Sequence, residues 1–263
     1  MTDREQLLAL YRVCFPEDDP SFWEWIFRRV YVPENTLVIR ENDRILASLQ
    51  MIPCEMHLGE RHYTAHYIYA AATLPEARGR GLMGRLLAQA EEEGRRRSQA
   101  FSVLITQEDS LLEYYARFGY EGRCKMAMMP PAAEKLSSLH QCRMAVPEDI
   151  AALTALYEQA SRCMLCGLRD DAFWQIQLEL FGKGAWVLEK QGQITAYAFA
   201  DERGVMEAVG PEAGLLSATI APGKPWRTMP IADGRPMGSI KPLREEYREI
   251  MEQNPCFLNL MYN

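Results

Sequence analysis

The hydrophobic and polar positions near the start of the chain predict two helices, a hairpin and a long strand. Leucines recur at helical spacing in REQLLALY, and a second short helix is expected at the aromatic residues of SFWEW. In LVIRENDRILASL two apolar runs flank a polar turn, which is the pattern of a hairpin. RHYTAHYIYAAATL is rich in aromatic residues and indicates a strand that Pro75 ends.

After this strand the pattern changes to a helix, a buried strand and another helix. Leu82 and Leu86 begin an apolar stripe on a helix expected over 82–97. AFSVLIT is a short apolar run typical of a buried parallel strand, and Gly119 is expected to end the helix that follows it. A strand, loop, helix and strand in this order predict two parallel strands joined by a crossover.

A weak internal repeat predicts two copies of one unit. IAALTALY is similar to REQLLALY, RDDAFW to EDDPSFW, and WVLEKQGQITAYAF to LVIRENDRILASL. These features keep their order at offsets of 146 to 151 residues, although chance similarity between helix and hairpin segments is the alternative. The matching positions are Tyr11 with Tyr157, Trp23 with Trp174, and Ile45 with Ile194.

Composition and charge narrow the classes of function. With 48% hydrophobic and 25% charged residues the chain is an ordinary globular protein, and no apolar run approaches the ~18 residues of a membrane span. A net charge of −7 argues against a nucleic-acid partner. Seven cysteines, an odd number, favour reduced thiols, and the polar residues after Met1 do not resemble a secretory signal. We therefore expect a cytoplasmic protein without a membrane or nucleic-acid partner.

The segment ARGRGLMGRLL has the glycine spacing of two different phosphate-binding loops. Gly79, Gly81 and Gly84 spell the G-x-G-x-x-G of dinucleotide sites. However, four residues separate the strand from the first glycine, and no acidic residue follows the next strand, which ends at Ile105 and Thr106. Both features argue against a dinucleotide.

A diphosphate held at the helix N-terminus agrees better with the residues. The first amide groups of a helix lack backbone partners and point along the positive end of its dipole. The two glycines at 79 and 81 let phosphate oxygens approach the backbone, and Arg78, Arg80 and Arg85 add positive charge in an acidic protein. An ordinary solvated helix start is the alternative.

On these residues the chain resembles the GNAT superfamily of acyl-CoA N-acyltransferases. LPEARGRGLMGRLL, after a hairpin and a long strand, is similar to their motif A, Q/R-x-x-G-x-G/A, from Arg78 to Met83. Met83 stands where Gly or Ala is usual, and the enhanced-intracellular-survival branch tolerates a larger residue there. The resemblance covers roughly residues 3 to 125.

The resemblance implies a mixed α/β fold, in which helices flank a central mixed sheet, followed by a degenerate second GNAT-like half. It implies an acetyl-CoA-binding domain at 1–130, a linker at 131–141 and a degenerate domain with a C-terminal tail at 142–263. PEAGLLSATI echoes PEARGRGLMG without its arginines and paired glycines, so only the first half is expected to bind coenzyme A.

The resemblance also implies acetyl-CoA as cosubstrate, no metal, and a set of site residues. Tyr115, four residues before Gly119, matches the family's proton donor to the thiolate, and simple packing of this side chain is the alternative. In the similar branch the C-terminal carboxylate enters the site, which makes Asn263 a candidate base. The residues expected to bind acetyl-CoA are Ala71, Thr73, Arg78, Gly79, Arg80, Gly81, Leu82, Met83 and Gly84, of which Gly84 is also interpreted as a close-packed residue of the first turn.

Other candidates for a base or a metal ligand are weaker. His62 and His66 share one face of the long strand, and Glu55 and Glu113 are alternatives. Cys163-Met-Leu-Cys166 is an isolated C-x-x-C, with His140 and Cys142 as its only nearby companions, so free thiols are expected rather than a zinc site.

Two functions follow from these residues. The first is an acetyl-CoA-dependent N-acetyltransferase acting on a primary amine, with a cationic acceptor such as an aminoglycoside, polyamine or peptide N-terminus as one option. The second is a non-catalytic acyl-CoA-binding or regulatory module. The acceptor and the oligomeric state stay open.

Overall fold

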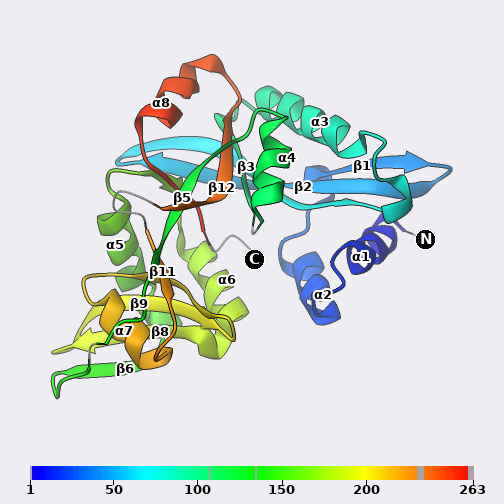
Figure 1. Ribbon diagram of the computed structural model, residues 1–263. Coiled ribbons are helices and arrows are strands. Elements are labelled where there is room, and N and C mark those ends of the chain that lie inside the picture. The colour runs from blue at the N-terminus through cyan, green and yellow to red at the C-terminus, as the bar shows by residue number, and fades with distance from the viewer. Residues whose placement is uncertain (1, 107, 134, 230–233, 260–263) are drawn as a thin grey trace.

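The computed structural model describes residues 2–106, 108–133, 135–229 and 234–259. In the first half the predicted order of two helices, a hairpin, a long strand and a crossover is confirmed (Figure 1). The elements are α1 (Asp3–Cys14), α2 (Pro20–Arg29), β1 (Thr36–Glu41), β2 (Arg44–Leu58), β3 (Arg61–Thr73), α3 (Leu82–Arg96), β4 (Phe101–Ile105), α4 (Asp109–Ala116) and β5 (Glu121–Met129).

Helices cover both faces of the first half's sheet. α1 and α2 lie on one face, and α3 lies on the other (Figure 1). On the first face, Ser48 and Gln50 of β2 donate hydrogen bonds to the hydroxyl of Tyr11. On the second face, α3 approaches β3 so closely that a Cβ on Gly94 would lie 2.8 Å from the ring of His66. The sheet is therefore buried on both sides, as its nearly continuous apolar strands require.

The repeated acidic clusters begin helices. The carboxylate of Asp19 accepts a hydrogen bond of 2.7 Å from the amide of Ser21 at the start of α2. Asp170 accepts one of 2.7 Å from the amide of Phe173 at the start of α6 (Asp171–Phe181). A carboxylate at this position satisfies a backbone donor that the helix leaves unpaired. The acidic residues of EDDP and RDDA thus have a structural role in both halves.

The second half repeats the order of the first and extends it further than the sequence indicated. Two helices precede a hairpin, and β10 is antiparallel to β9 and parallel to β11, as β3 is to β2 and β4. PEAGLLSATI supplies α7, in the place of α3. The elements are β6 (His140–Met144), α5 (Ile150–Ser161), β7 (Leu165–Gly167), α6, β8 (Ala185–Lys190), β9 (Gln193–Asp201), β10 (Gly204–Val209), α7 (Ala213–Ile220) and β11 (Trp226–Thr228).

The end of the chain returns to the sheet of the first half. β12 (Arg235–Pro242) is antiparallel to β4 and to β5, and β13 (Cys256–Phe257) lies between β7 and β5, after α8 (Arg248–Gln253). The division into 1–130 and 142–263 stays a prediction, but strand pairing crosses it. The stretch from Gly223 to Gly238 is rich in glycine and proline, yet it contains β11 and the start of β12.

Each half has its own core, and α2 and α6 connect them. Trp23 and Trp174, which match in the repeat, are 2% and 0% exposed. Trp25 instead donates a hydrogen bond of 2.6 Å to Glu179 of α6, and Arg29 forms an ion pair of 2.9 Å with the same carboxylate. No helix within the described ranges is both long and apolar enough to cross a membrane.

Candidate functional site

The first feature of the site is a gap between β3 and β4. The two strands pair in parallel from Ala65 with Phe101 to Tyr67 with Val103, and no pair is recorded beyond these positions in the described parts of the strands. β3 nevertheless continues to Thr73. The last residues of β3 therefore keep backbone groups that β4 does not occupy.

A bulge in β3 lies at this gap. Ala70 has a φ of +46°, a left-handed conformation that few non-glycine residues adopt. The register with β2 shifts at the same place, between Ser48 and Gln50. Bulges re-aim backbone groups, and strained backbone of this kind gathers at binding sites. Ala71 and Thr73, the predicted pantetheine-binding positions, follow this bulge directly.

The glycine loop joins this end of β3 to α3. Gly79 and Gly81 have φ values of +74° and +72°, and neither has any atom within 4 Å of where a Cβ would lie. The first amide of α3 with a backbone partner is that of Arg85, which donates to the carbonyl of Gly81. The amides of Leu82, Met83 and Gly84 have no such partner among the described residues. This geometry suits a diphosphate at the helix N-terminus.

Gly84 is close-packed. A Cβ at this position would lie 2.8 Å from the ring of Phe118, at the end of α4. Phe118 also contacts Tyr114, with ring centroids 5.2 Å apart. The glycine at 84 thus lets α4 approach α3, while its amide faces the same end of the helix as those of Leu82 and Met83.

The three arginines of the loop differ in their partners. The guanidinium of Arg78 donates to the carbonyl of Thr73 at 3.2 Å. Arg80 is paired with Glu41 of β1. The guanidinium of Arg85 has neither a hydrogen bond nor an ion pair with any residue that the structure describes, and the side chain is exposed. Among the described residues no carboxylate neutralises Arg78 or Arg85, and only the guanidinium of Arg85 lacks any hydrogen-bond partner.

Tyr115 lies on α4, close to the loop. Its ring contacts those of Tyr114 and Tyr120, with centroids 5.3 and 6.0 Å away. Burial, followed by the neighbouring Tyr114, raises the pKa of Tyr115 to about 12. Its hydroxyl has no hydrogen-bond partner in the described part of the chain, whereas the hydroxyl of Tyr120 bonds Ser102 at 2.7 Å. Tyr115 is therefore a neutral phenol with an unused proton.

The histidines of β3 lie away from the gap. His66 is fully buried, and its Nδ1 bonds Oε1 of Gln99 at 2.6 Å. The amide of Gln99 donates to Ala65, so its oxygen must be the acceptor and Nδ1 of His66 carries the proton. His62 is exposed near the hairpin end, 3.4 Å from Glu55. Neither histidine is placed to remove a proton from an amine, and Asn263 lies outside the described residues.

The second half has a charged side chain at the position that corresponds to Ala71. Glu207 lies four residues before Pro211, as Ala71 lies four residues before Pro75. Its buried carboxylate forms two hydrogen bonds with Arg169, one of them 2.8 Å long. The hydroxyl of Tyr197 donates to the same carboxylate at 2.9 Å. A buried ion pair therefore stands at the position that corresponds to Ala71, while β10 and β11 have one recorded pair, Val205 with Trp226.

The same ion pair holds the last described residue. Asn259 donates to the carboxylate of Glu207 at 3.0 Å and to the carbonyl of Met206 at 3.2 Å, while Arg169 donates to its carbonyl. The start of the C-terminal tail is thus fixed to the core of the second half.

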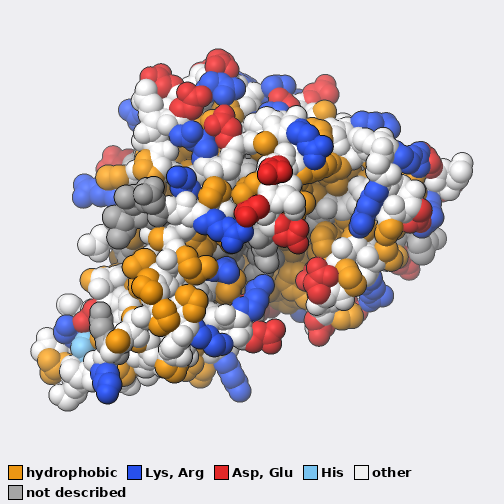
Figure 2. All heavy atoms as spheres, viewed as in Figure 1, with side chains coloured by type: hydrophobic (Ala, Val, Ile, Leu, Met, Phe, Trp, Pro, Cys, Tyr) orange, Lys and Arg blue, Asp and Glu red, His pale blue; other side chains and the backbone are white. Residues whose placement is uncertain are grey.

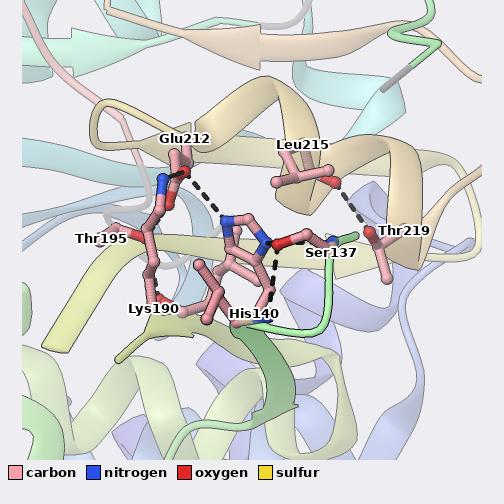
Figure 3. Close-up of polar contacts among 9 residues, drawn as sticks. Ser137, His140, Lys190, Thr195, Glu212, Leu215 and Thr219 are labelled. Atoms are coloured by element: carbon pink, nitrogen blue, oxygen red, sulfur yellow. Dashed lines mark hydrogen bonds and ion pairs between the residues drawn. The ribbon is translucent and has the colours of Figure 1, made fainter. Parts of the chain in front are cut away.

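Hydrogen bonds connect Ser137 of the linker, His140 of β6 and Glu212 before α7 (Figure 3). Nδ1 of His140 lies 2.8 Å from the hydroxyl of Ser137, and Nε2 lies 3.1 Å from Glu212. The amide of Ser137 also donates to Nδ1, and Glu212 accepts from Lys190 and Thr195. These extra bonds consume the groups that a hydrolytic triad would need free, so the network anchors the linker to α7.

The cysteines do not gather at a metal site. Cys166 is buried, and its Sγ lies 3.0 Å from Nε2 of His57, while Cys163 is exposed. The structure contains no group of three or more metal-ligating side chains with suitable geometry among the residues it describes. His140 belongs to the network with Ser137 and Glu212 instead of the C-x-x-C.

A hollow lies between the halves. Figure 2 shows hydrophobic side chains on the floor of the hollowed face and charged side chains on its rim. A cavity of about 500 Å³ at the contact of β2 with α6 includes two carboxylates, Glu55 and Asp170, and the apolar side chains of Phe173 and Leu258. Asp170 caps α6 and Glu55 is close to His62, so both carboxylates already have partners.

Comparison with solved structures shows the same fold over nearly the whole chain. A probable N-acyltransferase from Enterococcus faecalis is similar with a TM-score of 0.69 at 11% identity, over 92% of this chain and 70% of the other. Eis1 from Mycobacterium abscessus gives 0.62 at 13% identity, over 92% and 73%. A tandem GNAT protein from the clavulanic acid biosynthesis pathway gives 0.53 at 12%, over 92% and 95%.

Comparison of sequences identifies the first half. No curated protein matches the chain. The profile of the acetyltransferase (GNAT) domain matches residues 1–122, which hold the bulge, the glycine loop and Tyr115. Residues 1–122 therefore match a GNAT acetyltransferase domain, and the whole chain is similar in fold to a tandem GNAT protein.

Proposed function

We propose that the protein is an N-acetyltransferase that moves an acetyl group from acetyl-CoA to a primary amine. The observation that carries the proposal is the meeting of three features at one place. A helix start with unpaired amides, a gap between two parallel strands and a buried tyrosine with a free hydroxyl all belong to residues 67–115. Together they match the parts that direct acetyl transfer needs.

The loop and the gap would hold the cosubstrate. The amides of Leu82, Met83 and Gly84 would bind the diphosphate, with Arg85 as its charged partner. The backbone of Ala71 and Thr73 would bind the pantetheine arm along the open edge of β3. The open space at Gly79 and Gly81 supports this assignment, because side chains there would block the approach of phosphate oxygens.

Tyr115 would protonate the leaving sulfur. Acetyl-CoA supplies a thioester, and attack of the amine on its carbonyl carbon forms a C–N bond as the C–S bond breaks. The thiolate that leaves needs a proton. Burial that raises the pKa of Tyr115 would also disfavour a charged thiolate beside it, so the proton moves as negative charge develops on sulfur.

The amine must also lose a proton. The C-terminal carboxylate of Asn263 remains our proposed base. The hydrogen bonds of Asn259 with Arg169 and Glu207 support it, because they fix where the tail begins. Deleting residues 261–263 tests this role, because normal activity of the shortened chain would remove Asn263 from the mechanism. The option of a cationic acceptor stays a prediction, since Glu55 and Asp170 in the cavity between the halves already have partners.

A non-catalytic acyl-CoA-binding module is the second candidate. The absence of the glycine loop from PEAGLLSATI favours it in part, because a half without its own coenzyme A site can bind a partner instead. Thiol release from acetyl-CoA across a panel of primary amines separates the two. Amine-dependent release supports the enzyme, whereas tight binding of coenzyme A without turnover of any amine supports the module. A cytoplasmic location belongs to the same proposal, and all seven cysteines are free thiols, as it requires.

A further inference from the structure

A small pocket lined by arginines and methionines lies where β5, β11 and β12 meet. Its volume is about 110 Å³. Arg227 of β11 pairs with Met128 of β5, and Arg235 of β12 pairs with Met126, so their side chains share one face of the sheet. Met237 completes the lining.

The pocket has an unused positive charge. Arg227 is half-buried, and its guanidinium makes no hydrogen bond or ion pair with any described residue. Burial, followed by nearby Arg203, lowers the pKa of its guanidinium. Asp201, the closest source of negative charge, is paired with Arg203 at 2.7 Å. Arg235 has one partner, the exposed Asp109 at 2.9 Å. In a protein of net charge −7 this leaves two arginines facing a pocket with little to neutralise them.

The pocket lies at the end of β4, on the edge of that strand opposite the gap between β3 and β4. The amide of Thr106, just past β4, donates a hydrogen bond of 2.9 Å to the carbonyl of Met237. Gly238 pairs with Ile105, the last residue of β4. On the other side, Asp109, the partner of Arg235, is the first residue of the helix that carries Tyr115. The pocket and the gap therefore lie at the same end of β4, next to the helix that carries Tyr115.

We propose that this pocket binds a carboxylate of the acceptor, so that the substrates are amines that also carry a carboxylate, such as amino acids or peptides. The inference rests on the proposed acetyl transfer. Two guanidinium groups suit the planar oxygens of a carboxylate, and methionine side chains adapt to the carbon chain between the two charged groups. A phosphate of coenzyme A would also bind two guanidinium groups, so the experiment must distinguish a carboxylate of the acceptor from a phosphate of the cosubstrate.

The test compares matched acceptors in variants of the full chain. Thiol release is measured with an amino acid and with its amide, which has the same amine but no carboxylate. Arg227→Gln should reduce kcat/KM for the amino acid by about 10-fold or more and leave the amide nearly unchanged. Arg96→Gln is the control, since Arg96 is exposed on α3 and paired with Glu93. Equal loss for both acceptors would overturn the proposal.

Direct binding separates this inference from the proposed function. Calorimetry with wild-type protein and coenzyme A should show the amino acid binding more tightly than its amide, and Arg227→Gln should remove the difference. This result would support the pocket even if no amine turned over, which would refute only the acetyl transfer. Weaker binding of coenzyme A to Arg227→Gln, with unchanged binding of the form without its 3′-phosphate, would assign the arginines to the cosubstrate and overturn the inference.

Discussion

Tyr115 and His66 show how burial holds two titratable side chains neutral by opposite shifts. It raises the pKa of Tyr115 to about 12 and lowers the pKa of His66 to about 4. The sequence placed Tyr115 correctly on the helix after β4, because its distance from Gly119 is local. It did not decide the environment of His66, because strand alternation shows which residues share a face but not that Gln99 and α3 cover them.

Tyr115→Phe should lower kcat by about 10²-fold or more, since it removes the only proposed proton donor to the thiolate. Binding of coenzyme A, measured by calorimetry, should change less than about twofold, because the loop and the gap are untouched. Tyr114→Phe is the matched control and should keep its activity, as Tyr114 packs on Phe118. Unchanged turnover of Tyr115→Phe would remove this residue from the mechanism.

His66 should make stability depend on pH below about 6.5. Its folded-state pKa is lowered, so the unfolded chain binds the extra proton, and stability falls as pH drops from about 6.5 towards about 4. The shift corresponds to up to about 3 kcal/mol in the free energy of unfolding. Urea unfolding at the two ends of this range should show a smaller loss for His66→Leu than for wild type. The same loss in both proteins would contradict this account, and His62→Leu, at an exposed site, is the control.

At the scale of elements, the sequence predicted α3 within one residue and a glycine loop before it, because glycine spacing and an apolar stripe are local signals. It could not distinguish the three arginines of the loop. Arg80 is neutralised by Glu41, from a strand 39 residues earlier, and only the fold brings them together. The same limit applies to the matched positions of the repeat. Nothing in the local sequence indicates that Glu207 forms an ion pair with Arg169.

Arg85→Ala should weaken the binding of coenzyme A by about 10-fold, because Arg85 is the arginine of the loop without a partner among the described residues. The slope of affinity against salt concentration should fall as well. Arg96→Ala, at the other end of α3 and paired with Glu93, is the control and should change affinity by less than about twofold. Calorimetry at several salt concentrations measures the affinity for coenzyme A and its salt dependence. Equal effects of Arg85→Ala and Arg96→Ala would argue against a diphosphate at the loop.

On the scale of the whole molecule, two similar halves are interlocked by strands from the end of the chain. The sequence predicted the repeat, which depends on local helix and hairpin patterns. It missed the return of β12 to β4, because RPMGSIKP has no counterpart in the first half and its partner lies more than 130 residues earlier. Long-range pairing of this kind depends on which sheet edge is open, and a single sequence does not encode that locally.

The buried ion pair of the second half should be costly to break on one side only. Glu207→Gln leaves Arg169 buried without a countercharge and should lower the free energy of unfolding by about 3–5 kcal/mol. Replacing both residues, as Arg169→Met with Glu207→Leu, should cost less than the single change. Chemical unfolding of the three proteins measures this. A single variant as stable as wild type would show that the pair does not hold the second half together.

A crystal structure of the protein with bound coenzyme A tests the central claim most directly. The account predicts one molecule per chain, with diphosphate oxygens on the amides of Leu82, Met83 and Gly84 and the sulfur beside the hydroxyl of Tyr115. The second half should be empty, because PEAGLLSATI lacks the arginines and the paired glycines of the first loop. Coenzyme A bound in the second half, or bound with its sulfur away from Tyr115, would contradict the account.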